Sequence, residues 1–218
     1  LCRPSACSVF LFFHGLAARN LSGAIMRGFP DIATLFRVTS RDPKDGAFAA
    51  LSLPIPREAA MLIVLLVSIL STLLALIIQF VAPQQLPSGM EEIARPEPWL
   101  LAVRQFGQLM VLICAIYFGG RILDGRGGFK DVAVVLSWLQ IYSIPFQLTV
   151  VLSAVFAPQL GAVLFMGVGA YLIYVMVGFI DIVHELGSMW KATKLLILVL
   201  VALALGFSLL LTLFATGA

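Results

Sequence analysis

Three ionisable side chains near residue 180 are the first candidates for chemistry. Asp181, His184 and Glu185 stand at positions i, i+3 and i+4, so a helix would place them on one face. Such a group could supply half of a metal site or a proton relay, since ionisable residues inside membrane segments tend to be functional. The sequence offers no second such cluster, because the only other histidine is His14. A solvated acidic helix end is the simpler explanation, and we expect neither a metal nor a cofactor.

A glycine-rich segment, residues 119–130, suggests a phosphate-binding loop. It reads Gly-Gly-Arg-Ile-Leu-Asp-Gly-Arg-Gly-Gly-Phe-Lys. A P-loop requires Gly-x4-Gly-Lys-Ser/Thr between a strand and a helix, whereas Arg126 and Gly127 occupy the last two positions here. A tight turn between two helices explains the glycines without a ligand. The basic residues of this segment are better candidates for contact with anionic lipid or a partner; they are Arg121, Arg126 and Lys130.

Polar residues concentrate in one otherwise apolar run, residues 132–156. Gln140 and Gln147 are seven residues apart and share a helical face, with Ser143 close to it. Hydrogen bonds between the helices of a bundle would explain these side chains. A polar path for a solute is the alternative, and Arg104 of the preceding apolar run could approach the same interior or reach the outer interface.

The composition requires membrane-spanning helices to position these residues. Of the 218 residues, 61% are hydrophobic and 11% are charged, and the mean hydropathy is +1.06. A soluble domain carries about 25% charged residues, so a water-soluble enzyme and a disordered regulator are excluded. Five apolar runs each approach the ~20 residues of a bilayer crossing, and none shows the alternation of a strand. The sequence predicts an all-α polytopic membrane protein with spans at about 59–82, 98–118, 132–156, 160–180 and 195–214.

The distribution of lysine and arginine orients these spans. If the five spans alternate in direction, 12 of the 14 basic residues fall on one side. Short loops rich in basic residues face the cytoplasm. We therefore expect a multi-pass protein of the inner (plasma) membrane, with a cytoplasmic amino terminus and its carboxyl terminus on the opposite side. This distribution accounts for the net charge of +3, so we expect no nucleic-acid partner.

The chain before the first span divides into two parts. We expect Met26 to be the start, with residues 1–25 an extension from upstream read-through; a signal peptide is the alternative. Residues 26–57 predict a cytoplasmic segment of short amphipathic helices, one with Asp42 as its N-cap and Pro43 at its first position. Such helices usually lie in the headgroup interface, and a docking site for a soluble cytoplasmic protein is the alternative. The basic residues for either contact are Arg37, Arg41 and Lys44.

Small residues four apart would let helices approach closely. They fit a compact bundle within residues 58–218 or a homo-oligomer, and they do not choose between the two. The pairs are Ala115/Gly119, Ala133/Ser137, Ala202/Gly206 and Ala204/Ser208.

The order of these features resembles the Yip family, the Ypt/Rab-GTPase-interacting membrane proteins with five spans. The resemblance covers roughly Phe29 to Ala215 and rests on Arg41-Asp42-Pro43 before the first span. It rests also on Gly127-Gly128-Phe129-Lys130-Asp131 followed by Gln140-Ile141-Tyr142-Ser143-Ile144-Pro145. For eukaryotic members it implies association with Rab GTPases and vesicle traffic. This chain has no clear Asp-Leu-Tyr-Gly-Pro motif and looks more like the short bacterial form, so the resemblance implies the architecture and not the activity.

These features together predict a non-enzymatic membrane protein. Motifs of hydrolases and zinc proteases, Gly-x-Ser-x-Gly and His-Glu-x-x-His, are missing from the sequence. We expect a scaffold or a membrane-organising, trafficking-related role through contacts with lipid or protein. The alternative is a small transporter or channel subunit with its polar path along the third span. An enzyme that uses Asp181, His184 and Glu185 is the third hypothesis.

Overall fold

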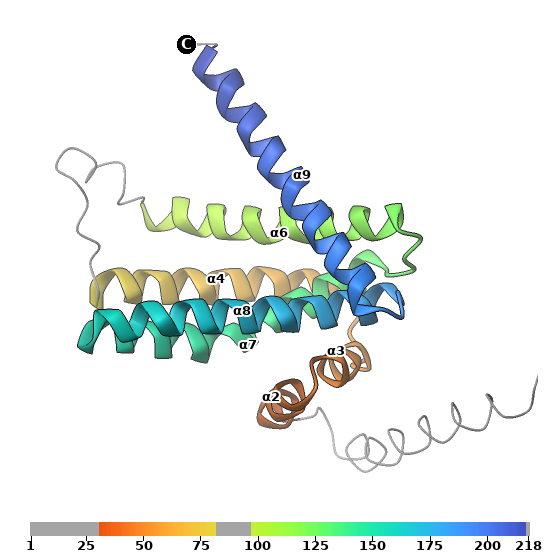
Figure 1. The fold of residues 1–218 in the computed structure, drawn as a ribbon, viewed down its shortest axis with the longest axis horizontal. Coiled ribbons are helices and arrows are strands. Elements are labelled where there is room, and N and C mark those ends of the chain that lie inside the picture. The colour runs from red at the N-terminus through yellow and green to blue at the C-terminus, as the bar shows by residue number, and fades with distance from the viewer. Residues whose placement is uncertain (1–30, 82–96, 217–218) are drawn as a thin grey trace, which may run out of the picture.

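The computed structural model describes residues 31–81 and 97–216, and these residues form seven helices and no strand (Figure 1). Two short helices come first and five long ones follow. The short helices are α2 (Ile32–Arg41) and α3 (Pro43–Leu51). The long helices are α4 (Arg57–Val81), α6 (Pro98–Ile122), α7 (Phe129–Phe156), α8 (Pro158–His184) and α9 (Met189–Thr216). The expectations about residues 1–25 and Met26 lie outside the described residues.

The five long helices are long and apolar enough to cross a membrane, which confirms the predicted all-α fold with five spans. Helices α4 to α8 contain between 25 and 28 residues, or about 38–42 Å at 1.5 Å per residue, against a hydrocarbon core of about 30 Å. All five extend past the predicted spans at one end or both; for example, α7 begins at Phe129 rather than Val132, and α8 ends at His184 rather than Ile180. The apolar pattern stops at the first charged side chain, whereas the backbone helix continues.

Local sequence explains where several helices begin and end. The Asp42 side chain accepts a hydrogen bond from the Lys44 backbone N–H at 2.8 Å, and Pro43 occupies the first position of α3, as predicted. Ala157 alone separates α7 from α8, and Pro158 begins α8 without needing a backbone donor. Glu185 adopts a left-handed conformation (φ 53°) that ends α8.

Helices α4, α6, α7 and α8 run side by side, and α9 crosses them obliquely, packed on α6 and α8 (Figure 1). The pair α2–α3 lies on the flank of α7 and α8. Buried side chains from every span and from α2–α3 form one core. Among them are Val64, Ile113, Val135, Phe179 and Leu195.

One end of the bundle brings together the start of α4, the end of α6, the start of α7, the end of α8 and the start of α9. We call it the basic end. Within the described residues, every lysine and arginine except Arg104 lies there or on α2–α3. Those at the basic end itself are Arg57, Arg121, Arg126, Lys130, Lys191 and Lys194.

Candidate functional site

Side-chain hydrogen bonds fasten α2 to the two central spans. The indole Nε1 of Trp138 on α7 donates to Thr39 Oγ1 of α2 at 3.0 Å, and both residues are buried. A chain of hydroxyls lies beside this bond: Ser40 Oγ is 3.0 Å from the Tyr142 hydroxyl, which is 2.7 Å from that of Tyr171 on α8. The chain joins one residue from each of three helices, so the position of α2 depends on specific partners as well as on apolar contact.

Aromatic rings reinforce the same contact. The ring centroid of Phe36 on α2 lies 4.6 Å from that of Tyr142 and 6.0 Å from that of Phe146. Phe146 in turn lies 5.6 Å from Tyr171. Aromatic pairs at these separations contribute about 0.5–1.5 kcal/mol beyond the area they bury. The bundle therefore covers Leu35 and Phe36 on the apolar face of α2.

An ion pair fastens α3. Lys44 Nζ lies 2.6 Å from Asp181 Oδ2, and the Asp181 side chain is only 3% exposed. The second carboxylate oxygen accepts the Ser188 backbone N–H at 2.9 Å. Pro43 packs beside Gly178, where an added Cβ would lie 3.0 Å from the proline Cβ. Both oxygens of this buried carboxylate are thus satisfied, which a buried charge requires. We call this ion pair, with the hydrogen bonds and rings around Tyr142, the docking joint.

The other two basic residues predicted on this segment lie outside the docking joint. Arg37 and Arg41 are one helical turn apart on α2, and both side chains are exposed. Lys44 differs from them because it faces Asp181. On α3, partial burial and, to a lesser degree, the neighbouring Asp42 raise the pKa of the Asp45 carboxyl. Within α2–α3, basic groups free to meet another molecule therefore lie on α2.

The glycine-rich segment encloses His184. The imidazole is 1% exposed and packs directly against Gly120 at the end of α6. A Cβ added at Gly125 would lie 2.9 Å from His184 Cβ, and one added at Gly127 would lie 2.6 Å from His184 Nδ1. The Arg126 backbone N–H donates to the His184 carbonyl at 3.2 Å. These glycines leave space for a histidine ring, a reason for the motif that has nothing to do with phosphate.

The three ionisable residues near the end of α8 have separate surroundings. Asp181 faces Lys44, His184 lies among the glycines, and Glu185 is exposed at 3.9 Å from Arg126. Among the described residues, no group of three or more His, Cys, Asp or Glu could hold a metal ion. The shared helical face does not bring their functional groups to one point.

The polar row of α7 is brought together against α4. Gln140 Nε2 donates to Ser71 Oγ at 3.1 Å, Ser143 Oγ donates to the Gln140 carbonyl at 2.8 Å, and Gln147 Nε2 donates to Ser143 Oγ at 2.8 Å. Arg104 is exposed on α6, and the structure gives it no bond to these three side chains. The row therefore consists of Gln140, Ser143 and Gln147 without Arg104.

The basic residues of the glycine-rich segment all lie at the basic end. The Arg121 guanidinium donates to the Tyr117 hydroxyl at 2.9 Å and lies 5.3 Å from the centre of that ring. Arg126 is exposed opposite Glu185, and Lys130 is half-buried in the first turn of α7. This arrangement leaves the charged groups of Arg121 and Arg126 at the surface.

A comparison with protein-family models identifies a family for most of this chain. Residues 38–210 match the family model described as the Yip1 domain. The chain belongs to this family. Searches of curated proteins and of solved structures each returned no match to the chain. The matched part of this Yip1 domain begins inside α2 and ends inside α9, so Thr39, Ser40 and Lys44 of the docking joint lie within the family domain.

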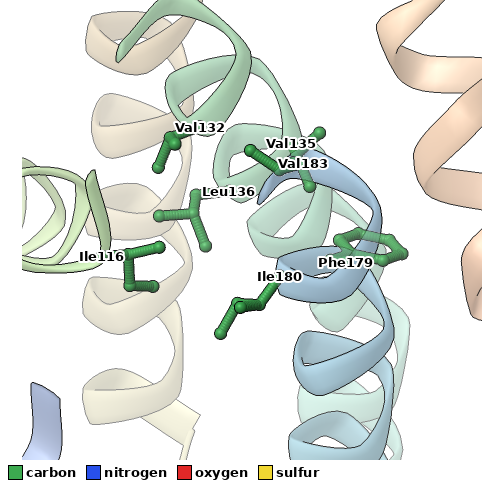
Figure 2. A pocket seen from close by; sticks show the side chains of 7 residues that line it. All are labelled: Ile116, Val132, Val135, Leu136, Phe179, Ile180 and Val183. Carbon is green, nitrogen blue, oxygen red and sulfur yellow. The ribbon is translucent and has the colours of Figure 1, made fainter. Parts of the chain in front are cut away.

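In this Yip1 domain a small cavity also lies among α6, α7 and α8, next to the glycines that surround His184 (Figure 2). Figure 2 shows its lining side chains converging from the three helices. All of them are apolar, and a buried water needs two to four polar partners. The cavity therefore offers no route for a polar solute. Its lining consists of Ile116, Val132, Val135, Leu136, Phe179, Ile180 and Val183.

Sequence reasoning missed the docking joint. Lys44 and Asp181 are 137 positions apart, and although each was a candidate by itself, no spacing in the sequence pairs them. One signal was present. Asp181 directly follows an apolar run, so its carboxylate is expected to be buried with the run and to need a cation from elsewhere in the chain. His184 and the glycines were both noticed, and only the packing shows that they belong together.

Proposed function

We propose that this Yip1 domain is a non-enzymatic scaffold that organises the membrane and the molecules at one of its faces. The docking joint is the observation that carries the proposal. It fastens a helix pair to the bundle and leaves Arg37 and Arg41 of that pair exposed. A fixed basic surface beside a bilayer suits contact with anionic lipid or with a soluble partner.

We further propose that the basic end faces the cytoplasm of the inner (plasma) membrane. The support is the gathering of lysine and arginine at the ends of spans that lie together, together with the rule that such residues stay on the cytoplasmic side. The carboxyl terminus would then lie on the opposite side. Cytoplasmic proteins, the lipid bilayer and further copies of the chain are the partners that this orientation allows.

The transporter alternative has weaker support. Its polar row is occupied by hydrogen bonds within α7 and to Ser71 of α4, as expected of side chains that hold helices together. The cavity beside α7 is lined by apolar side chains only. These observations favour a packing role for Gln140, Ser143 and Gln147.

Crosslinking in native membranes, followed by detergent pull-down and mass spectrometry, tests the scaffold. We would compare the wild-type chain with a charge-reversed variant, Arg37→Glu with Arg41→Glu. The matched control is Lys191→Glu with Lys194→Glu, which reverses two exposed charges on α9 at the basic end. Loss of a specific co-purifying protein or anionic lipid in the α2 variant alone is the expected result. Recovery of the wild-type domain by itself would contradict the proposal.

A further inference from the structure

The pair α2–α3 lies beside the spans rather than beyond their ends. Phe36 packs on Phe146, and Ser40 bonds to Tyr142, whose hydroxyl bonds to Tyr171 in the middle of α8. In Figure 1, α2 appears foreshortened on the flank of α7 and α8, across the direction of the spans. A cytoplasmic helix resting on the bundle would instead contact only its last turns.

The length of the α7–α8 hairpin places α2 inside the bilayer. From Tyr142 to the end of α7 at Phe156 the helix rises about 21 Å, and from Pro158 to Tyr171 α8 rises about 20 Å. Ala157 is the whole turn between them. If the membrane surface passed at the level of α2, the hairpin would fall about 10 Å short of crossing a hydrocarbon core of about 30 Å. Any tilt of the helices would increase this deficit.

Helix α4 leads to the same placement independently. It carries no charged residue after Glu58, so its hydrocarbon-embedded part begins near Ala59. Ser71 lies about 18 Å further along this helix and bonds to Gln140. Tyr142, which holds Ser40, is two residues beyond Gln140 on α7. Measured along α4, this level is about 18 Å from the start of the embedded part, deeper than the about 10 Å that the hairpin gives, and both values place α2 within the embedded part of the helices.

The exposed surface of α2–α3 carries both apolar and charged side chains, and the charged ones are Asp31, Arg37, Arg41, Asp42 and Asp45. Ile32 and Phe48 are 67% and 51% exposed, so two large apolar side chains are left for acyl chains. Arg37 and Arg41 are exposed on the same helix pair, and their long side chains can reach anionic headgroups. Amphipathic helices that lie in the membrane plane sink their apolar face about 5–10 Å below the headgroup boundary.

We propose that α2–α3 is embedded in the leaflet of the basic end, where it widens the domain in that leaflet only and acts as a wedge that favours convex curvature toward that side. The helix pair α2–α3 does not cover the half of the α7–α8 hairpin near Ala157, where large apolar side chains are exposed. These include Phe156, Phe165 and Met166. The wedge is a physical mechanism for the membrane-organising function proposed above, and the inference rests on that proposed function.

Depth measurements on the reconstituted full-length chain test the wedge. A fluorophore would be attached to single cysteines at Ile32→Cys and Phe48→Cys, and at Arg126→Cys as the control in the loop before α7, after the native cysteines are replaced by alanine. We expect nitroxide-labelled acyl chains to quench the first two positions and aqueous iodide to quench only the third. Iodide quenching at all three positions, without quenching by the acyl chains, would overturn the proposal.

Partitioning between small and large unilamellar vesicles of phosphatidylcholine and phosphatidylglycerol tests the consequence for curvature. The wild-type chain should prefer small vesicles, with its basic end outward. Replacing Ile32 and Phe48 by asparagine should abolish that preference, because these side chains fill the leaflet without packing in the core. Ile122→Asn is the matched control, since Ile122 is 71% exposed at the end of α6; it should keep the preference. Equal partitioning of the wild-type chain would contradict the wedge.

The two proposals can fail separately. The wedge would stand without the scaffold if the labels at residues 32 and 48 lie in the membrane and the chain prefers small vesicles, but reversing the charges of Arg37 and Arg41 removes no partner or lipid. Water-exposed labels, with a partner that depends on Arg37 and Arg41, would leave the scaffold and remove the wedge.

Discussion

Toward the basic end, α7 and α8 are covered by protein and carry specific bonds, whereas toward the Ala157 turn they present exposed apolar side chains. The covered half contains Trp138, Tyr142 and Asp181, each with a named partner on another element. The far half is represented by Phe156 and Phe165, which are exposed. The same two helices thus meet protein over one half and are left to lipid over the other.

This difference indicates where sequence changes should matter. Lipid accepts any apolar side chain of suitable size, so the far half constrains composition more than identity. Hydrogen bonds, ion pairs and close glycine contacts require particular atoms at particular places. Gly161 is the exception in the far half, because an added Cβ there would lie 2.5 Å from Ala154 Cα across the turn. Four substitutions test this contrast, and the largest expected effect comes first.

Gly120→Val should destabilise the bundle most. The new side chain would occupy the space of the His184 imidazole, and overpacking of this kind costs about 1–3 kcal/mol, or more where the neighbour cannot move. Gly107 of the same helix has nothing within 4 Å of an added Cβ, so Gly107→Val should change stability by no more than about 0.5 kcal/mol. Unfolding in detergent micelles measures both. Adding His184→Ala should restore part of the loss, and equal effects at the two glycines would refute the close packing of Gly120 on His184.

Lys44→Met should lower the free energy of unfolding by about 2 kcal/mol. Removing one partner of a fully buried pair costs about 3–5 kcal/mol, and the figure is smaller here because 39% of the Lys44 side chain is exposed. Lys191→Met, at an exposed position on α9, is the control and should be close to neutral. Adding Asp181→Leu to Lys44→Met should recover stability by removing the unpaired carboxylate. A Lys44 variant as stable as the control would show that the ion pair does not fasten α3.

Tyr142→Phe should cost about 1 kcal/mol, because it removes the hydroxyl between Ser40 and Tyr171 and keeps the ring. The control from the far half of α7 is Thr149→Val, which removes a hydroxyl bonded only to the Pro145 carbonyl of its own helix. We expect the control to change stability by less. Proteolysis between α2 and α4 should also become faster in the Tyr142 variant alone. An unchanged rate of cleavage would mean that the aromatic rings hold α2 on the bundle without the hydroxyl.

Gln140→Leu should have the smallest effect, about 0.6 kcal/mol, the average for an interhelical hydrogen bond in a membrane. It removes the bond to Ser71 of α4. Gln79→Leu, at an exposed position near the far end of α4, is the control for adding an apolar side chain. Solute flux in reconstituted vesicles should be the same for wild type and both variants. A flux that Gln140→Leu abolishes would instead support the transporter alternative.

Several features of this Yip1 domain were determined by the sequence alone. Five apolar runs of sufficient length predict five helices, because a backbone in hydrocarbon must satisfy its hydrogen bonds within the segment. Asp42 and Pro43 predict the start of α3 from chemistry confined to one turn. The basic residues between spans predict which span ends lie together. All of these depend on neighbours in the chain or on the solvent around it.

Only the tertiary structure decided which residues meet. The pairing of Lys44 with Asp181, the enclosure of His184 by glycines and the position of α2 against Tyr142 each join distant parts of the chain. Apolar spans do not specify their neighbours, because lipid tails are as apolar as leucine and give no hydrophobic preference for one helix over another. The choice falls to polar side chains and to small residues that permit close approach, and their partners become visible only when the helices are packed.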